Sequence, residues 1–220
     1  RELQRRLTTR PTLGSRRAVI IDPADDMETS AANALLKSLE EPPAGTYFLL
    51  IAHRIGRLLP TIRSRCRVLD FPRVSDLDMD AVLARESPQA SPQERAAAIA
   101  AASGSPGAAI DFVELDLGKI HTLMKQVVEQ GDPDFALRGR LASAMGQRPS
   151  REKQLAAIEL ARAVVADQMR VVTPGQIPAM VDTHGELVRL AGQAPTYNFD
   201  PGLLVMEIGT LLAGLAGSRT

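Results

Sequence analysis

Asp22 is the first residue whose type and position suggest chemistry. It follows the apolar run "AVII" at residues 18–21. Nucleotide-binding α/β proteins often place a carboxylate just beyond a buried strand, where it holds magnesium beside phosphate groups. The alternative is an ordinary turn or cap residue, because aspartate also favours those positions. Asp22 is therefore a candidate cofactor-binding residue with a structural alternative.

The run "TIRSRC" at residues 61–66 is a second candidate for phosphate chemistry. Neither Arg63 nor Arg65 has an acidic partner nearby in the sequence. A guanidinium group is planar, permanently charged and well matched to phosphate oxygens. One of these arginines is therefore a candidate for binding a group outside this chain. The alternative is an arginine that is solvated or paired within the chain.

More charged residues surround these two motifs. Positive charge near Arg65 is raised by four further arginines, Arg54, Arg57, Arg63 and Arg67. They indicate either a surface that faces phosphate or a solvated rim with ion pairs to other subunits. Glu40 and Glu41 end an expected helix, where negative charge opposes the helix dipole. They favour either a contact to a neighbouring subunit or plain solvation.

Short apolar strands and an amphipathic helix must position these residues. "AVII" at 18–21 and "YFLLIA" at 47–52 are typical of strands buried on both faces of a parallel sheet. Between them, Ala32, Leu35, Leu36 and Leu39 form one helical stripe, and Pro42 and Pro43 stop that helix. "RVLDF" at 67–71 indicates another strand. Residues 1–72 are therefore predicted to be part of an α/β sheet domain.

Helix signals dominate after Pro72. Ser91 to Glu94 form a capping box before an alanine-rich stretch, and Ser150 can cap a long helix to about Arg170. The remaining helices are expected at 106–115, before Gly131, at 179–193 and from Asp200 onward. The fold class is therefore α/β followed by all-α.

Composition excludes several classes of protein. Lys plus Arg and Asp plus Glu number 26 each, so no global positive charge drives nucleic-acid binding, and only 3% aromatic residues leave few rings for base stacking. No apolar run is long enough to span a membrane. One cysteine excludes an internal disulfide and suits a reducing cytoplasm. His53, His121 and His184 are too scattered to indicate a metal site.

Residues 18–73 together resemble the clamp-loader branch of the AAA+ ATPases. The resemblance rests on the Walker-B-like strand, "NALLKSLEEPP", "FLLIA" and the "SRC" motif at 64–66, in that order. "SGSPGAAIDF" at 103–112 resembles the sensor-2 segment of the family's lid domain. The resemblance implies three domains: a partial AAA+ α/β domain at 1–72, a helical lid at 73–116 and a helical collar for oligomerisation at 117–220.

Three positions depart from the pattern of an active ATPase in this family. Pro23 stands where an active Walker B has the glutamate that orients water, His53 stands at the sensor-1 position, and Gly107 replaces the sensor-2 arginine. Phosphoryl transfer depends on charges already in place, so these departures predict little or no hydrolysis. A chain with these three departures resembles the delta-prime type of subunit in the bacterial DNA polymerase III clamp loader.

The resemblance assigns Arg65 a catalytic role in trans. It implies an arginine finger that contacts the γ-phosphate of ATP held by a neighbouring subunit, with Ser64 supporting the turn and Asp22 as a degenerate Walker B residue. The implied partners are the gamma/tau ATPase and delta subunits, the sliding clamp and primed DNA, within a hetero-oligomer of the cytoplasmic bacterial DNA-directed DNA polymerase III holoenzyme. The chain itself is expected not to be catalytic.

The sequence contains no GxxxxGK[ST] phosphate-binding loop. We expect the family's phosphate-binding loop and a four-cysteine zinc module to lie in a segment before residue 1, so that no cofactor is required within these residues. The alternatives are an active gamma/tau-type ATPase, a purely structural scaffold subunit, and a DNA-binding module acting alone.

Overall fold

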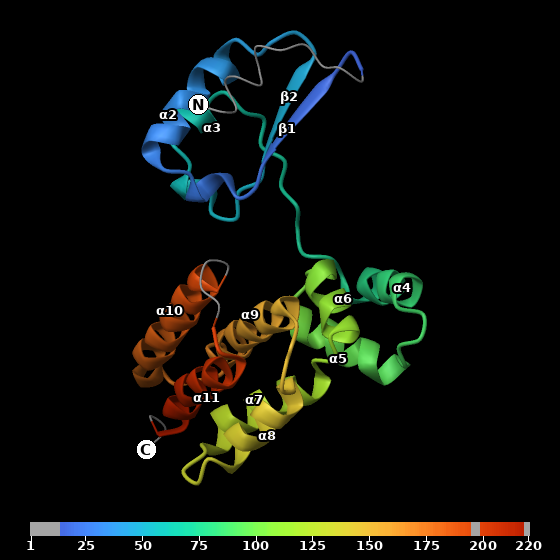
Figure 1. Ribbon diagram of the computed structural model, residues 1–220, viewed down its shortest axis with the longest axis vertical. Coiled ribbons are helices and arrows are strands. Elements are labelled where there is room, and N and C mark those ends of the chain that lie inside the picture. The colour runs from blue at the N-terminus through green and yellow to red at the C-terminus, as the bar shows by residue number, and fades with distance from the viewer. Residues whose placement is uncertain (1–13, 195–198, 218–220) are drawn as a thin grey trace. The chain divides into compact units, whose positions relative to one another are not determined.

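The computed structural model describes residues 14–194 and 199–217, and the chain divides into two compact units. The first unit ends at Phe71 and the second begins at Pro72 (Figure 1). Both described strands lie in the first unit, and the described part of the second unit is helical. The predicted order, α/β followed by all-α, is therefore confirmed at this level.

The first unit is a strand–helix–strand crossover. β1 (Arg17–Ile21) and β2 (Thr46–Leu50) form a parallel pair, and α2 (Thr29–Glu40) connects them. Three short turns of helix accompany them: η1 (Ala24–Asp26), η2 (Ile55–Arg57) and α3 (Pro60–Arg63). The carboxyl ends of parallel strands meet at one edge of a sheet. The segments after β1 and after β2 therefore lie close together.

The stripe predicted for α2 buries only part of its length. Ala32 and Leu35 are buried, whereas Leu36 and Leu39 are half-buried. The helix ends at Glu40, directly before Glu41 and the paired prolines. The prolines therefore mark the end of this helix as expected, because a proline lacks the N–H that would continue it.

Two strand predictions are wrong. β1 and β2 are not buried on both faces, because half-buried and exposed residues alternate along each strand, with Ile20 62% exposed and Tyr47 56% exposed. Residues 67–71 form no strand, and Phe71 is 92% exposed. A strand needs a hydrogen-bonded neighbour, and within the described residues the sheet consists of β1 and β2. Apolar sequence alone could not supply that neighbour.

Eight α-helices make up the described part of the second unit. They are α4 (Asp76–Glu86), α5 (Pro92–Ala102), α6 (Pro106–Glu114), α7 (Gly118–Gln130), α8 (Ala136–Met145), α9 (Arg151–Gln168), α10 (Ile177–Gln193) and α11 (Pro201–Gly217), with a 3₁₀ turn, η3 (Pro174–Gln176). The capping box at Ser91 is confirmed, because its hydroxyl accepts from Glu94 N–H and the Glu94 carboxylate accepts from Ser91 N–H. None of these helices is both long and apolar enough to cross a membrane within the described residues.

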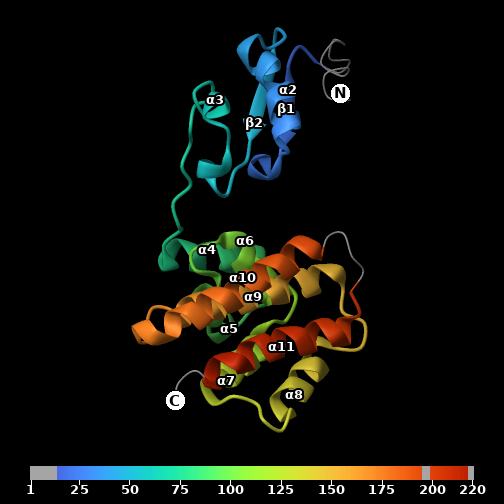
Figure 2. The same cartoon turned by 90° about the vertical axis from the view of Figure 1, so that its left-hand side faces the viewer.

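One continuous hydrophobic core runs through the second unit, from Met79 in α4 to Leu215 in α11. α9 packs along α10, and α7 packs against both α8 and α11 (Figure 2). α5 also contacts α7 and α9. The core thus crosses residue 116 without a break, and the predicted division into a lid at 73–116 and a collar at 117–220 stays a prediction.

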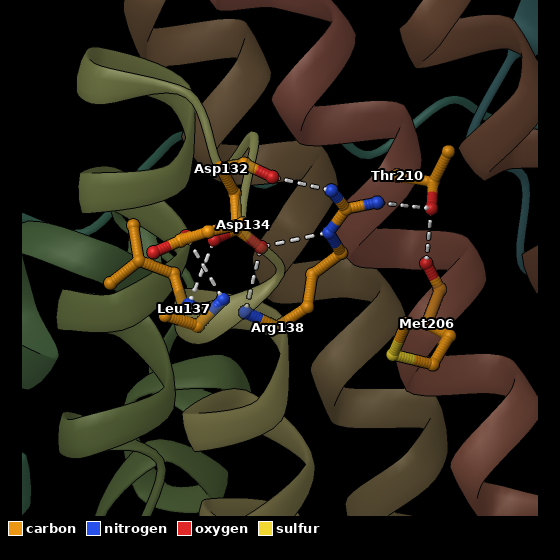
Figure 3. A network of polar contacts seen from close by, with 7 residues as sticks. Asp132, Asp134, Leu137, Arg138, Met206 and Thr210 are labelled. Atoms are coloured by element: carbon orange, nitrogen blue, oxygen red, sulfur yellow. Dashed lines mark hydrogen bonds and ion pairs between the residues drawn. The ribbon is translucent and has the colours of Figure 1, made fainter.

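A buried ion pair holds the turn between α7 and α8 against α11 (Figure 3). Arg138 Nε lies 2.8 Å from Asp132 Oδ2, and Arg138 Nη1 donates to Thr210 Oγ1 at 3.1 Å. Burial alone would raise the pKa of Asp132. Hydrogen bonds from the Arg138 side chain and from the backbone N–H groups of Leu137 and Arg138 outweigh burial and hold that pKa below its ordinary value. This carboxylate therefore stays charged inside the fold.

Candidate functional site

The turn that carries Arg65 is built on one short helix. α3 begins with Pro60, whose fixed backbone suits the first helical position, and Ile62 is 0% exposed. Ser64 caps the helix at its carboxyl end, and its hydroxyl donates to the carbonyl oxygen of Thr61 at 3.1 Å. Burial of Ile62 fixes the base of the turn. The residues that follow it are held at the surface.

Arg65 is anchored in this turn, and its side chain is partly exposed. Its Nη1 donates to the Thr61 carbonyl oxygen at 2.9 Å and to Ser64 Oγ at 3.3 Å. Its Nη2 forms an ion pair with the Glu40 carboxylate at the end of α2, and the Arg65 side chain is 36% exposed. The acidic partner that the neighbouring sequence lacks is therefore supplied from an earlier helix. Arg65 is partly paired within the chain and still reaches solvent.

Cys66 completes the motif behind the arginine. It is half-buried, and burial raises the pKa of its thiol. A neutral thiol at this position packs rather than reacts.

Asp22 follows the last residue of β1 directly. It is exposed, as is Pro23 after it. No group of three His, Cys, Asp or Glu side chains suited to a metal ion occurs in the part of the chain that the structure describes. Asp22 therefore lies directly after β1, and its part in cofactor binding stays a prediction.

Asp25 is a buried residue of this region that sequence reasoning missed. Its side chain is 1% exposed, and its two oxygens accept from the backbone N–H groups of His53 at 3.2 Å and Arg54 at 3.1 Å. Burial alone would raise its pKa, but these hydrogen bonds outweigh burial and lower it. Asp25 thus ties the Walker-B-like segment after β1 to the sensor-1 position after β2. The only sequence signal was a further acid two residues beyond Pro23.

The cluster of basic residues near Arg65 is partly neutralised by the chain itself. Arg54 Nη2 lies 3.2 Å from Asp26 Oδ1, and Arg57 Nη1 lies 3.8 Å from the same oxygen. Arg63 and Arg67 have no ion pair among the residues that the structure describes. The charge open to an external phosphate is therefore concentrated at Arg63, Arg65 and Arg67.

Gly107 lies in the first turn of α6, in the second unit. A Cβ atom built there would meet nothing within 4 Å. Packing therefore leaves room for a longer side chain, and glycine at the sensor-2 position is not imposed by steric crowding.

These features agree with the order of elements that the sequence resemblance predicts. A parallel strand–helix–strand unit carries an acidic segment after its first strand and an arginine-bearing turn after its second, and an all-helical unit follows. This is the arrangement expected of the clamp-loader branch of the AAA+ ATPases.

Comparisons with known proteins show which proteins this chain resembles. Residues 1–75 match the family model described as "DNA polymerase III, delta subunit". The chain is 61% identical to the DNA polymerase III subunit delta' of Pseudomonas aeruginosa over 54 residues, which are 24% of this chain and 16% of the relative. It is 39% identical to the Escherichia coli subunit delta' over 116 residues, which are 53% of this chain and 34% of the relative. The predicted resemblance to the delta-prime subunit is therefore confirmed.

Two further matches show how widely the fold is shared. The DNA polymerase III subunit gamma/tau of Mycobacterium tuberculosis is 39% identical over 85 residues, 39% of this chain and 15% of the relative. The crystal structure of a DNA polymerase III gamma subunit-related protein from Thermotoga maritima aligns with a TM-score of 0.51, at 19% identity, over 98% of this chain and 78% of that one. That structural likeness shows the fold alone. The matches span 16% and 34% of the lengths of the two delta' relatives.

Proposed function

We propose that this chain acts as a non-hydrolysing subunit of a bacterial DNA polymerase III clamp loader, which loads the sliding clamp onto primed DNA. In this role it places Arg65 against the γ-phosphate of ATP held by a neighbouring gamma/tau-type subunit. The observation that carries the proposal is the geometry of Arg65. Its Nη1 is anchored to Thr61 and Ser64, while the side chain remains 36% exposed.

An anchored and partly exposed guanidinium suits this chemistry. Charge builds on the phosphoryl oxygens during transfer, and a fixed cation stabilises it without reorganising at that moment. Arginine fingers in other nucleotide hydrolases raise the rate by about 10³–10⁵. A flexible arginine would lose much of this effect, because its side chain must first be ordered. The anchored Nη1 removes part of that cost.

The same chain lacks the groups needed to hydrolyse ATP itself. Pro23 follows Asp22 where a glutamate would orient the attacking water, and a proline ring offers no acceptor for that task. Gly107 carries no cation for the phosphates, although the space around it is open. In this proposal the nucleotide belongs to the neighbouring subunit, and the residues described require no cofactor of their own.

The test is ATP hydrolysis by a reconstituted clamp loader that contains the full-length chain. With DNA and clamp present, Arg65→Ala is expected to lower turnover of the adjacent site at least about tenfold, which corresponds to about 1.4 kcal/mol in the barrier. Arg85→Ala is the control, because Arg85 is an exposed arginine in α4, outside the basic cluster around Arg65. Assembly is checked by size, since loss of the complex would lower turnover for a different reason.

One observation favours a second candidate function, that of a scaffold subunit. Arg65 already has an acidic partner in Glu40, so its charge is partly satisfied within the chain. Unchanged turnover in the assembled Arg65→Ala complex would establish the scaffold. Hydrolysis by the isolated full-length chain would instead favour an active gamma/tau-type ATPase.

A further inference from the structure

Glu40 and Arg65 connect two segments that are distant in sequence. Glu40 is the last residue of α2, Arg65 lies just beyond α3, and the two helices pack against each other. The Glu40 carboxylate forms an ion pair with Arg65 Nη2. The position of the Arg65 side chain is thus set from two directions, by its own turn and by the end of α2.

The contacts that anchor the guanidinium fall on its two Nη atoms. Nη1 donates to Thr61 and Ser64, and Nη2 faces Glu40. Within the described part of the chain, Nε makes no hydrogen bond. A guanidinium has five N–H groups, of which Nε contributes one and Nη2 two. The Nε–H group therefore has no acceptor within the described residues and remains available to an external anion, while Nη1 and Nη2 are held.

The site also accounts for an acid that is poorly placed in its own helix. Carboxylates at a helix carboxyl end are disfavoured by the helix dipole, and a nearby cation relieves this. Arg65 provides that cation for Glu40, whereas Glu41 has no ion pair within the described residues. The two adjacent glutamates are therefore not equivalent, and Glu40 is the one that contacts the arginine.

We propose that Glu40 is a positioning residue for Arg65, which orients the guanidinium so that its Nε side meets a phosphate group from a neighbouring subunit. This inference rests on the proposed function of Arg65 in trans. Glu40 touches no phosphate itself. It narrows the range of side-chain positions that Arg65 samples before the phosphate binds, so its effect falls on the rate of transfer.

The experiment compares wild type, Glu40→Gln, Arg65→Ala and the double variant in a reconstituted clamp loader with the full-length chain. Because exposed ion pairs are weak, Glu40→Gln is expected to lower kcat about threefold to fivefold and to change KM for ATP less than about twofold. The double variant is expected to match Arg65→Ala alone, since Glu40 acts only through Arg65. Glu41→Gln is the matched control and is expected to keep wild-type turnover.

A second readout is independent of hydrolysis. In nitrogen-detected NMR of the full-length protein, rotation about the Arg65 Nε–Cζ bond is expected to be slower in wild type than in Glu40→Gln. Equal rotation in the two proteins would show that Glu40 does not order the arginine.

The possible failures differ from one another. If Arg65→Ala lowers turnover but Glu40→Gln leaves it unchanged or raises it, the positioning role is wrong and the finger stands. A further loss when Glu40→Gln is added to Arg65→Ala also overturns the positioning role. If Arg65→Ala itself has no effect, the proposed function fails, and the inference fails with it.

Discussion

Arg65 in the first unit and Arg138 in the second both form ion pairs, but burial gives the two pairs different roles. The Arg65 side chain is 36% exposed and that of its partner Glu40 is 48% exposed, whereas the values are 8% for Arg138 and 0% for Asp132. Nε, Nη1 and Nη2 of Arg138 all have acceptors. The Nε–H group of Arg65 remains available to an external group, whereas the buried Arg138 side chain makes its contacts within the fold.

Each unit is correspondingly held together in a different way. In the first unit, polar contacts join the ends of the strands, as Asp25 does with the backbone after β2. In the second unit a continuous apolar core does most of the packing, and the Asp132–Arg138 pair adds one fixed turn. An arginine that is available for function is therefore one that the fold anchors while leaving part of its side chain exposed.

The largest expected effect is at the buried pair. Arg138→Ala leaves Asp132 charged and without its main partner, so we expect the free energy of unfolding to fall by about 3–5 kcal/mol. Urea unfolding followed by circular dichroism measures this, because the second unit carries most of the helix. Arg140→Ala, exposed on the same helix, is the control and should change stability by less than about 0.5 kcal/mol. A similar effect of both changes would contradict the contrast between the two pairs.

A smaller effect is expected where α11 passes the buried arginine. A Cβ atom at Gly209 would lie 2.5 Å from Arg138 Cγ, so Gly209→Ala should destabilise the protein by about 1–3 kcal/mol through overpacking. Gly214 is on the same helix, and a Cβ atom there would meet nothing within 4 Å. Gly214→Ala should therefore stabilise by about 0.4–1 kcal/mol. Equal melting temperatures for the two variants would show that the Arg138 side chain can shift away from a Cβ atom at residue 209 without loss of stability.

The smallest effect on stability is expected at the exposed pair. Arg65→Ala removes an ion pair between two partly exposed side chains, which is worth about 0–1 kcal/mol. Thermal unfolding of the full-length chain measures it, with Arg63→Ala as the matched change on α3. A loss of stability as large as that expected for Arg138→Ala would mean that Arg65 is a structural residue, and the two ion pairs would then have the same role.

Local signals in the sequence predicted much of the helical unit. The hydroxyl and carboxylate of a capping box lie three residues apart, so Ser91 and Glu94 announce the start of α5 without help from the rest of the fold. Ser150 does the same for α9, where its side chain accepts from Lys153 N–H. α8 lacks this local signal, because its N-cap residue Phe135 is left-handed and makes no side-chain cap; the carboxylates of Asp132 and Asp134 accept from its first backbone N–H groups instead. α8 also packs against α7 and α11.

Long-range pairing limited the prediction of the first unit. Residues 67–71 have the composition of a strand, but no strand pairs with them in the described structure. Asp25 drew no prediction from the sequence, because its partners are the backbone N–H groups of His53 and Arg54, which come from the segment after β2. Glu40 looked misplaced at the end of a helix until Arg65 was found beside it. In each case the deciding partner lies far away in the sequence.

The sequence by itself determined the order of strands and helices, the ends set by prolines and caps, and the motifs that resemble clamp loaders. These follow from interactions within a few residues and from strings of unusual residue types. Only the tertiary structure decided which carboxylate is buried and which arginine keeps free donors. The reason is physical: burial and ion pairing depend on distances between segments, and a guanidinium with the same chemistry is 8% exposed at Arg138 and 36% exposed at Arg65.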